Sequence, residues 1–387
     1  MKMVPYGHQS ISEDDIEAVI EVLRSDWLTQ GPMVERFEQA VAEYCDVKYG
    51  VVVCNATAAL HLACLALGVG KGDYVWTSPN TFLASANCAL YCGANIDFVD
   101  IDSNTYNLSI DALTKKLEAA VKNNKLPKLV IPVHFAGQSC DMKAIKALAD
   151  KYKFHIVEDA SHAIGGKYYD HKIGDCSYSD MTVFSFHPVK IITTGEGGMI
   201  MTNNSGIYEK LKLLRSHGMT RNNDMMEGES HGQWYYQQIA LGYNYRITDM
   251  QCALGLSQFN RIDDFVRKRY ELVEYYNQTL KELPLILPFQ ESYNYSAFHL
   301  YVVQLKLDQI TKTRCQVFDE LRNAGIGVAV HYIPVHLQPY YSQFGFVNGD
   351  FPKAEKYYQA AITLPLYVTL SDKGQGFVIS ELQRVLL

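Results

Sequence analysis

The sequence predicts an α/β protein, with a large domain built on a mostly parallel sheet and a small C-terminal α+β domain. Three observations carry this prediction. Short apolar strands alternate with helices through the first part of the chain, which is the pattern of β-α-β units with right-handed crossovers. The 387 residues exceed what one core comfortably holds. Mixed strands and helices follow a long helical stretch, so we expect domains over 1–250 and 251–387.

Two amphipathic helices begin the chain. The first is expected in "SEDDIEAVIEVL", where Ser12 can cap the helix and Asp15 follows three residues later. Its apolar residues share one face: Ile16, Val19, Ile20 and Leu23. After the loop "SDWLTQGP", a second helix has the same spacing, with Val34, Phe37, Val41 and Tyr44.

Strand–helix units follow. The run "YGVVVC" precedes the helix "NATAALHLACLAL", and "DYVWTS" precedes "TFLASANCALYCG". The same order continues with "NIDFVD" before "SIDALTKKLEAAVKN", "KLVIPVHF" before "DMKAIKALADKY", and then "FHIVEDA". Helices on both faces of a parallel sheet explain why these strands are apolar throughout.

The last third of the chain has a different pattern. A long helical stretch, "RITDMQCALGLSQFNRIDDFVRKRYELVEYYNQTL", leads out of the large domain. It is followed by the strand "HLYVVQLKL", the helix "TRCQVFDELRNAG", the strand "IGVAVHY" and two further helices. This content suits a small α+β domain.

Composition excludes several classes of protein. The chain is 48% hydrophobic and 20% charged, and its net charge of −7 argues against a nucleic-acid surface. We find no signal peptide and no apolar stretch of membrane-spanning length, so we expect a cytoplasmic protein with no membrane partner. The nine cysteines form no C-x-x-C pair, which favours reduced, buried thiols and no metal site.

Residues suited to chemistry follow the predicted strands, and ligands of α/β sheets bind at the carboxyl ends of strands. "IVEDASHA" places Asp159 at the end of one strand, with His162 three residues on. "VFSFHPVK" places Ser185 and Lys190 after another. "VVVCNATAAL" places Thr57 where a helix begins, so free N–H groups and a hydroxyl lie there.

An amine, a carboxylate and an anion cradle together are what pyridoxal phosphate requires. A lysine binds its aldehyde, a carboxylate keeps its ring nitrogen protonated, and a helix N-terminus holds its phosphate. Phe82 is the candidate for stacking on the ring, and the glycines after Lys190 allow a tight turn. Each residue alone has an ordinary structural explanation, such as a solvated lysine or a core phenylalanine. Their joint order favours the cofactor site.

Three longer segments resemble the DegT/DnrJ-type sugar aminotransferases: "EDASHAIGG", "FSFHPVKIITTGEGGM" and "GYNYRITDMQCALGLSQ". The resemblance covers nearly the whole chain and implies a fold-type-I pyridoxal-phosphate-dependent transferase, similar to aspartate aminotransferase, with pyridoxamine phosphate as the second cofactor form. The segments "SDWLTQGP", "SFHPVKIITT", "RSHGM" and "VHYIPV" are most similar to the family members of pseudaminic acid biosynthesis.

The resemblance also implies roles for individual residues. Lys190 is the catalytic residue, and Asn244 reaches the cofactor of the neighbouring subunit, which implies a homodimer with shared active sites. The implied cofactor-binding residues are Ala56, Thr57, Ala58, Phe82, Asp159, His162, Ser185, Lys190 and Asn244. The implied substrate-binding residues are Tyr6, Asp26, Trp27, Leu28, Thr29, Ala56, Val330, His331, Tyr332 and Ile333.

The implied reaction moves an amino group from L-glutamate to C4 of a UDP-linked 4-keto-6-deoxy-N-acetyl-hexosamine. The product is then UDP-4-amino-4,6-dideoxy-N-acetyl-β-L-altrosamine. Three alternatives stay open: an aminotransferase for another nucleotide-linked keto-deoxysugar, a cofactor-binding regulator without turnover, and an amino-acid aminotransferase. The last of these requires an arginine for the substrate carboxylate, which we cannot place from sequence.

Overall fold

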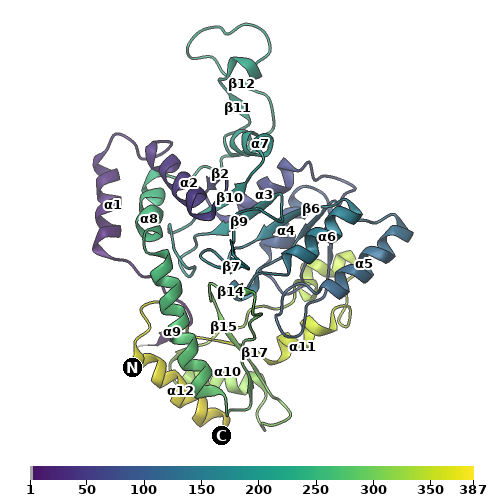
Figure 1. The fold of residues 1–387 in the computed structure, drawn as a ribbon, viewed down its shortest axis with the longest axis vertical. Helices are drawn as coiled ribbons and strands as arrows, with labels where there is room; N and C mark the ends of the chain where they lie inside the picture. The colour runs from purple at the N-terminus through teal and green to yellow at the C-terminus, as the bar shows by residue number, and fades with distance from the viewer. Residues whose placement is uncertain (1–2) are drawn as a thin grey trace.

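A seven-stranded sheet forms the centre of the larger part of the computed structural model, which describes residues 3–387 (Figure 1). Strand β10 is antiparallel to both of its neighbours and the other pairs are parallel, so the prediction of a mostly parallel sheet is confirmed. The order across the sheet is β2 (Tyr49–Val53), β10 (Gly198–Thr202), β9 (Met181–Ser185), β6 (His155–Asp159), β5 (Leu129–Ile131), β3 (Tyr74–Thr77) and β4 (Asn95–Phe98).

Helices cover both faces of this sheet, and two apolar cores result. One core contains residues of α2 (Pro32–Cys45), α5 (Ile110–Asn123), α6 (Met142–Tyr152) and α8 (Asp249–Phe259). The other contains residues of α3 (Ala56–Ala66), α4 (Ala84–Tyr91) and α7 (Ser205–Arg215). Because successive strand residues point to opposite faces, Val52 packs in the first core while Val51 and Val53 pack in the second.

Helix α1 (Glu13–Arg24) begins where the sequence predicts. The Asp15 N–H donates to Ser12 Oγ at 3.3 Å, and the Ser12 N–H donates to Asp15 Oδ2 at 2.9 Å. This reciprocal capping box satisfies two amide groups that a helix start leaves free. Asp15 is fully buried because it also accepts hydrogen bonds from Ser257, Gln258 and Arg261, which tie α1 to α8 and its C-terminal end.

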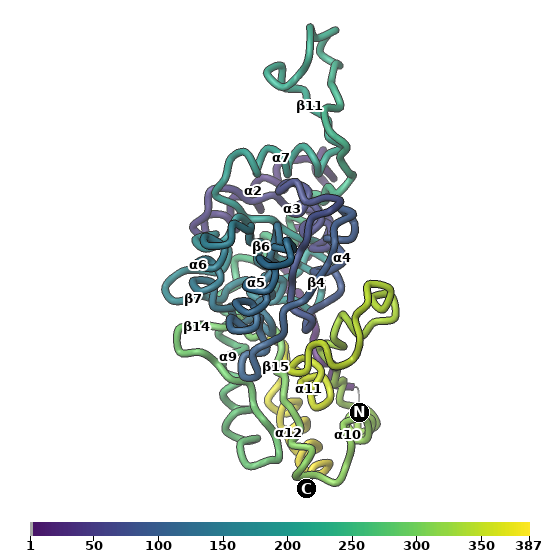
Figure 2. The backbone as a smooth tube through the Cα atoms, turned by 90° about the vertical axis from the view of Figure 1, so that its right-hand side faces the viewer, coloured from purple at the N-terminus to yellow at the C-terminus, as the bar shows by residue number. Residues whose placement is uncertain are grey.

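The smaller part of the molecule has its own sheet and core. Strands β13 (Leu285–Ile286), β15 (Tyr301–Leu305) and β17 (Ala361–Leu364) form an antiparallel sheet. Its helices are α10 (Arg314–Asn323), α11 (Pro352–Ala360) and α12 (Asp372–Leu386). Strand β1 (Val4–Pro5) pairs with β16 (Ile326–Gly327), so β1 lies in this part of the molecule (Figures 1 and 2).

The long helical stretch predicted after residue 245 is two helices rather than one. Helix α8 ends at Phe259 and α9 (Ile262–Leu280) begins after Arg261, whose guanidinium is held by Asp15 at 2.6 and 2.7 Å. The first turns of α9 pack in the core of the large sheet through Phe265 and Val266, and later turns pack in the core of the small sheet. Helix α9 therefore packs in the cores of both parts.

An arm projects from the large part beyond α7 (Figures 1 and 2). Strand β11 (Met219–Thr220) pairs antiparallel with β12 (Gln237–Gln238) at its base. The arm and the segment after it expose large apolar side chains: Trp234 is 74% exposed and Leu241 is 78% exposed. Across residues 3–387, no helix combines the length and the apolar character that crossing a bilayer requires.

Candidate active site

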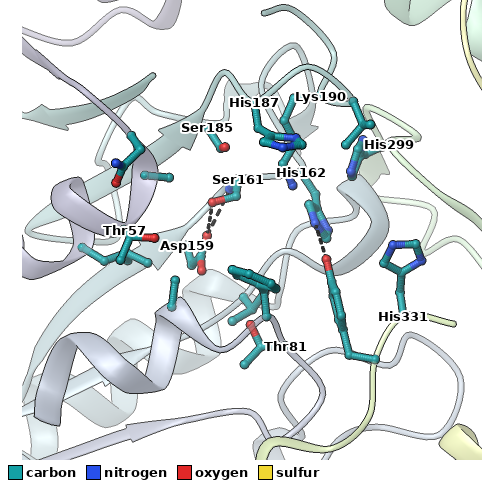
Figure 3. Close-up of a pocket in the computed structure, with 18 of the residues that line it drawn as sticks. Thr57, Thr81, Asp159, Ser161, His162, Ser185, His187, Lys190, His299 and His331 are labelled. Carbon is teal, nitrogen blue, oxygen red and sulfur yellow. Dashed lines mark hydrogen bonds between the residues drawn. The ribbon is translucent and has the colours of Figure 1, made fainter. Parts of the chain in front are cut away.

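A pocket of about 500 Å³ lies at the carboxyl ends of β2, β6 and β9, the position at which α/β sheets bind ligands. The start of the chain and the segment after β16 close its other side. The structure brings ten of the residues named from sequence to its wall: Tyr6, Ala56, Thr57, Phe82, Asp159, His162, Ser185, Lys190, His331 and Tyr332 (Figure 3).

Lys190 follows β9 in a turn in which its N–H donates to the His187 carbonyl at 2.9 Å. The side chain is half-buried in the pocket wall. Burial lowers the pKa of its amine to about 8, and the nearby Asp159 carboxylate opposes this shift only partly. A lowered pKa makes the uncharged amine available near neutral pH, which a nucleophile or a general base requires.

Asp159 ends strand β6 with its side chain toward the pocket, whereas Glu158 points to the opposite face and bonds to His134. The Asp159 Oδ2 accepts a hydrogen bond from Ser85 Oγ at 2.5 Å. Its Oδ1 accepts from the Ser161 N–H at 3.1 Å and from Ser161 Oγ at 2.6 Å. Donors on both oxygens hold the group as an oriented carboxylate, ready to face a cationic partner.

The N-terminus of α3 forms an anion cradle. Asn55 caps the helix by accepting the Ala58 N–H at 2.8 Å, so the N–H groups of Ala56 and Thr57 are the ones that helix geometry leaves free. The Ser185 hydroxyl lines the same pocket, and no hydrogen bond among the described residues uses it. Donors of this kind at a helix start suit a phosphate group.

Gly198 brings this cradle close to the sheet. It is the first residue of β10, and a Cβ atom there would lie 2.6 Å from the Ala56 nitrogen and 2.7 Å from its Cα. These are backbone atoms, so a side chain at Gly198 can be accommodated only if the start of α3 moves.

We therefore expect Gly198→Ala to weaken retention of a phosphate-bearing cofactor by about tenfold or more, because each lost charge-assisted hydrogen bond costs about 1.5–3 kcal/mol. The measurement is the dissociation constant from fluorescence titration of the cofactor-free protein. Gly376→Ala is the matched control, since a Cβ at Gly376 meets no atom within 4 Å. Equal affinities in the two variants would show that α3 does not need this close approach.

His162 lies deep in the pocket and is held by two hydrogen bonds. Its Nδ1 accepts the Ala136 N–H at 3.2 Å, and its Nε2 lies 3.1 Å from the Tyr332 hydroxyl. Burial, with Lys190 and His331 nearby, lowers the pKa of His162 well below its ordinary value. The ring is therefore neutral, and the bond to Ala136 places its proton on Nε2. Phe82 is 58% exposed beside Tyr332, which puts it at the pocket mouth.

The remaining predicted residues lie outside this pocket in the single chain. Residues 26–29 form an exposed loop between α1 and α2, and Ala58 uses its N–H in the helix cap. Val330 and Ile333 flank the pocket residues His331 and Tyr332 without lining the pocket. Asn244 pairs with Ser216 at the base of the arm. Their implied roles stay predictions.

Sequence reasoning missed other residues of the pocket wall: Asn55, Leu60, Thr81, Ala84, Val133, Ser161, His187, Val189, Glu196 and His299. Ser161 and His187 sit inside the motifs already singled out. Thr81 bonds to Ser85 at 2.8 Å, which extends the network behind Asp159, and their spacing of four residues is a local signal. His299 comes from a distant segment with no such signal.

The fold and this site define the class. Three features of the site fit pyridoxal phosphate. They are the lysine with a lowered pKa in the turn after β9, the Asp159 carboxylate held by hydrogen-bond donors, and the N-terminus of α3 with two free N–H groups. The protein is a pyridoxal-phosphate-dependent aminotransferase. It belongs to the DegT/DnrJ/EryC1/StrS aminotransferase family, whose model matches residues 9–383.

Curated relatives match along their whole length. The spore coat polysaccharide biosynthesis protein SpsC of Bacillus subtilis is 42% identical, with 99% of this chain and 97% of SpsC covered. The UDP-4-amino-4,6-dideoxy-N-acetyl-beta-L-altrosamine transaminase of Campylobacter jejuni (strain 81-176) is 38% identical, with 99% and 98% covered.

Solved structures of sugar aminotransferases have the same fold as this chain. Helicobacter pylori PseC, an aminotransferase of pseudaminic acid biosynthesis, superposes with a TM-score of 0.90 at 31% identity, covering 100% of this chain and 99% of PseC. The sugar aminotransferase Spr1654 of Streptococcus pneumoniae, in its PMP form, gives a TM-score of 0.90 at 30% identity, with 99% and 98% covered. Family and structures together point to pyridoxal phosphate as the cofactor.

Proposed function

We propose that this enzyme transfers an amino group from L-glutamate to C4 of UDP-2-acetamido-2,6-dideoxy-β-L-arabino-hexos-4-ulose. The product is UDP-4-amino-4,6-dideoxy-N-acetyl-β-L-altrosamine, a precursor of pseudaminic acid. The observation that carries this proposal is the whole-chain match to the Campylobacter transaminase and to PseC. The pocket size suits a substrate of this kind, since ligand pockets span about 300–1,000 Å³.

A second candidate is amination of a different nucleotide-linked keto-deoxysugar. The Bacillus relative has the higher identity of the two curated relatives described above, and its name refers to a spore coat polysaccharide. The two candidates share the cofactor site and the donor, and they differ in how the sugar ring lies in the pocket.

When bound, pyridoxal phosphate supplies an electrophilic aldehyde and an electron sink for charge at the donor's α-carbon. Lys190 would hold the cofactor's aldehyde, and once the donor's amine has displaced it, the freed Nζ would accept the proton from that α-carbon; its lowered pKa increases the uncharged fraction of this amine. Asp159 keeps the pyridine nitrogen protonated through the orientation that Ser85 and Ser161 give it. Ala56, Thr57 and Ser185 bind the phosphate in this proposal.

Three of the predicted cofactor residues complete the proposed site. Phe82, at the pocket mouth, would stack on the cofactor ring, and His162 would lie beside its 3′ oxygen. Asn244 of a second copy reaches the phosphate, so we infer a homodimer. The exposed apolar arm supports this assembly, since Trp234 and Leu241 require a partner surface to be buried.

The test is a reconstituted reaction with purified protein, pyridoxal phosphate, L-glutamate and the proposed keto-sugar nucleotide, with the product identified by mass and NMR. A 4-amino product with the altrosamine configuration supports the proposal. If glutamate removes the cofactor's absorbance but the sugar is left unchanged, the assignment as an aminotransferase stands and the second candidate substrate is favoured. No absorbance change with glutamate would mean either another donor or a binding protein without turnover.

A further inference from the structure

Four histidines line the pocket, and three of them share one side of its wall with Lys190. His162, His299 and His331 lie around Lys190, and in Figure 3 Thr57, Asp159 and Ser185 lie toward the other side. Among the described residues that line the pocket, none is an arginine. An amino donor nevertheless brings at least one carboxylate to Lys190, so this side of the pocket needs a group that binds an anion.

The three imidazoles differ in how well their nitrogens are satisfied. His162 uses both, with Ala136 and Tyr332. His331 uses Nδ1, which lies 2.8 Å from Thr363 Oγ1. His299 is only 4% exposed, and no described residue forms a hydrogen bond with either of its ring nitrogens. A buried polar atom without a partner costs about 1–3 kcal/mol, and no hydrogen bond in the free protein offsets this cost for the His299 ring.

The backbone, rather than the ring, fixes His299 in place. The buried Arg269 of α9 donates from Nη1 to the carbonyls of Phe298 at 3.1 Å and His299 at 3.3 Å. Gly137, at φ +107°, allows the close packing, because a Cβ there would lie 2.7 Å from the Phe298 nitrogen and 3.1 Å from the His299 nitrogen. The His299 ring packs on His162 with centroids 4.4 Å apart. The imidazole is thus positioned with Nδ1 buried and without a partner, and Nε2 is the nitrogen that remains available to a ligand in the pocket.

We propose that the His299 imidazole binds the α-carboxylate of the amino donor. This inference rests on the proposed function only in that the donor is an amino acid. The α-carboxylate is attached to the same carbon as the amine that must reach Lys190, and His299 lines the pocket beside Lys190 (Figure 3). A sugar hydroxyl fits less well, since the cationic groups near His299 are Lys190 and Arg269, which favour an anion.

Charge around His299 gives the proposal a consequence that can be measured. Burial lowers the pKa of His299 well below its ordinary value, and the groups that face it, Lys190, His162, Arg269 and His331, lower it further. The free imidazole is therefore neutral. A bound carboxylate stabilises the protonated ring and raises its pKa, so binding takes up a proton. It follows that affinity for the carboxylate decreases as pH rises.

The experiment measures binding of glutarate, a dicarboxylate without an amine, to the holoenzyme by calorimetry near pH 7 in HEPES and in Tris. The buffers differ in ionisation enthalpy, so the difference in heat reports proton uptake. Wild type is expected to bind with uptake. His299→Phe is expected to bind about tenfold or more weakly, because a charge-assisted hydrogen bond is lost. His299→Gln keeps a hydrogen-bonding group, and we expect intermediate affinity without uptake.

His155→Gln is the control, since this histidine lies at the opposite end of β6, paired with Asp180, and we expect it to match wild type. Unchanged affinity and uptake in both His299 variants overturn the proposal, as does a wild type that does not bind glutarate. The sugar reaction is scored separately. If glutarate binding depends on His299 but the proposed sugar is not aminated, the carboxylate site stands and the substrate assignment fails.

Discussion

Lys190→Ala is expected to reduce amino transfer by roughly 10⁴-fold or more, because one amine both binds the cofactor covalently and moves the proton at the donor's α-carbon. The measurement is the single-turnover rate with L-glutamate, followed by the absorbance of the cofactor. Because the other donors of the pocket remain, the variant is expected to retain the cofactor without a covalent bond, and denaturation should release it unmodified.

The fold of this variant is expected to be at least as stable as wild type when both lack cofactor. Burial lowers the pKa of Lys190 to about 8, below the value of an unfolded lysine, so the ammonium form is disfavoured in the folded chain. The unfolded state binds more protons between these two pKa values, and wild-type stability therefore rises with pH across that window. Lys190→Ala should lack this rise.

Lys71→Ala is the matched control, since this lysine is exposed in the loop between α3 and β3. Its turnover and its pH dependence of thermal unfolding should equal those of wild type. Substantial amino transfer by Lys190→Ala would remove the lysine from its proposed role. A lowered melting temperature in that variant would instead mean that the amine stabilises the folded chain.

The sequence predicts well the features that depend on local periodicity. Apolar strands alternating with helices yield the parallel sheet, and strand ends such as Asp159 and Ser185 meet at one edge because parallel strands share their direction. The helix cap at Ser12 likewise depends only on neighbours in the chain. Such features are encoded within a few residues of where they act.

Features that depend on contacts between distant segments were not predicted. His299 reaches the pocket because Arg269 and Gly137, from two other segments, fix its backbone. The break between α8 and α9 accompanies the bond of Arg261 to Asp15, which lies 246 residues away along the chain. The arm illustrates another limit, since its proposed role requires a second copy of the chain.

Asp159→Asn is expected to reduce turnover by about 10²- to 10⁴-fold with little change in the fold. The amide has the shape of the carboxylate: its oxygen can accept both Ser161 bonds, and its nitrogen can donate to Ser85 Oγ, whose proton can rotate away. What is lost is the negative charge that keeps the cofactor's ring nitrogen protonated, and with it the electron sink. The measurements are kcat and the melting temperature of the holoenzyme.

Ser85→Ala separates charge from orientation, because it keeps the carboxylate and removes the 2.5 Å bond that holds Oδ2. A lost hydrogen bond to a charged group is worth about 1.5–3 kcal/mol, so turnover is expected to decrease by about 10- to 10²-fold, less than in Asp159→Asn. If the two variants lose activity equally, orientation of the carboxylate matters more than its charge. If Asp159→Asn keeps wild-type turnover, another group protonates the ring, and the role proposed for Asp159 is wrong.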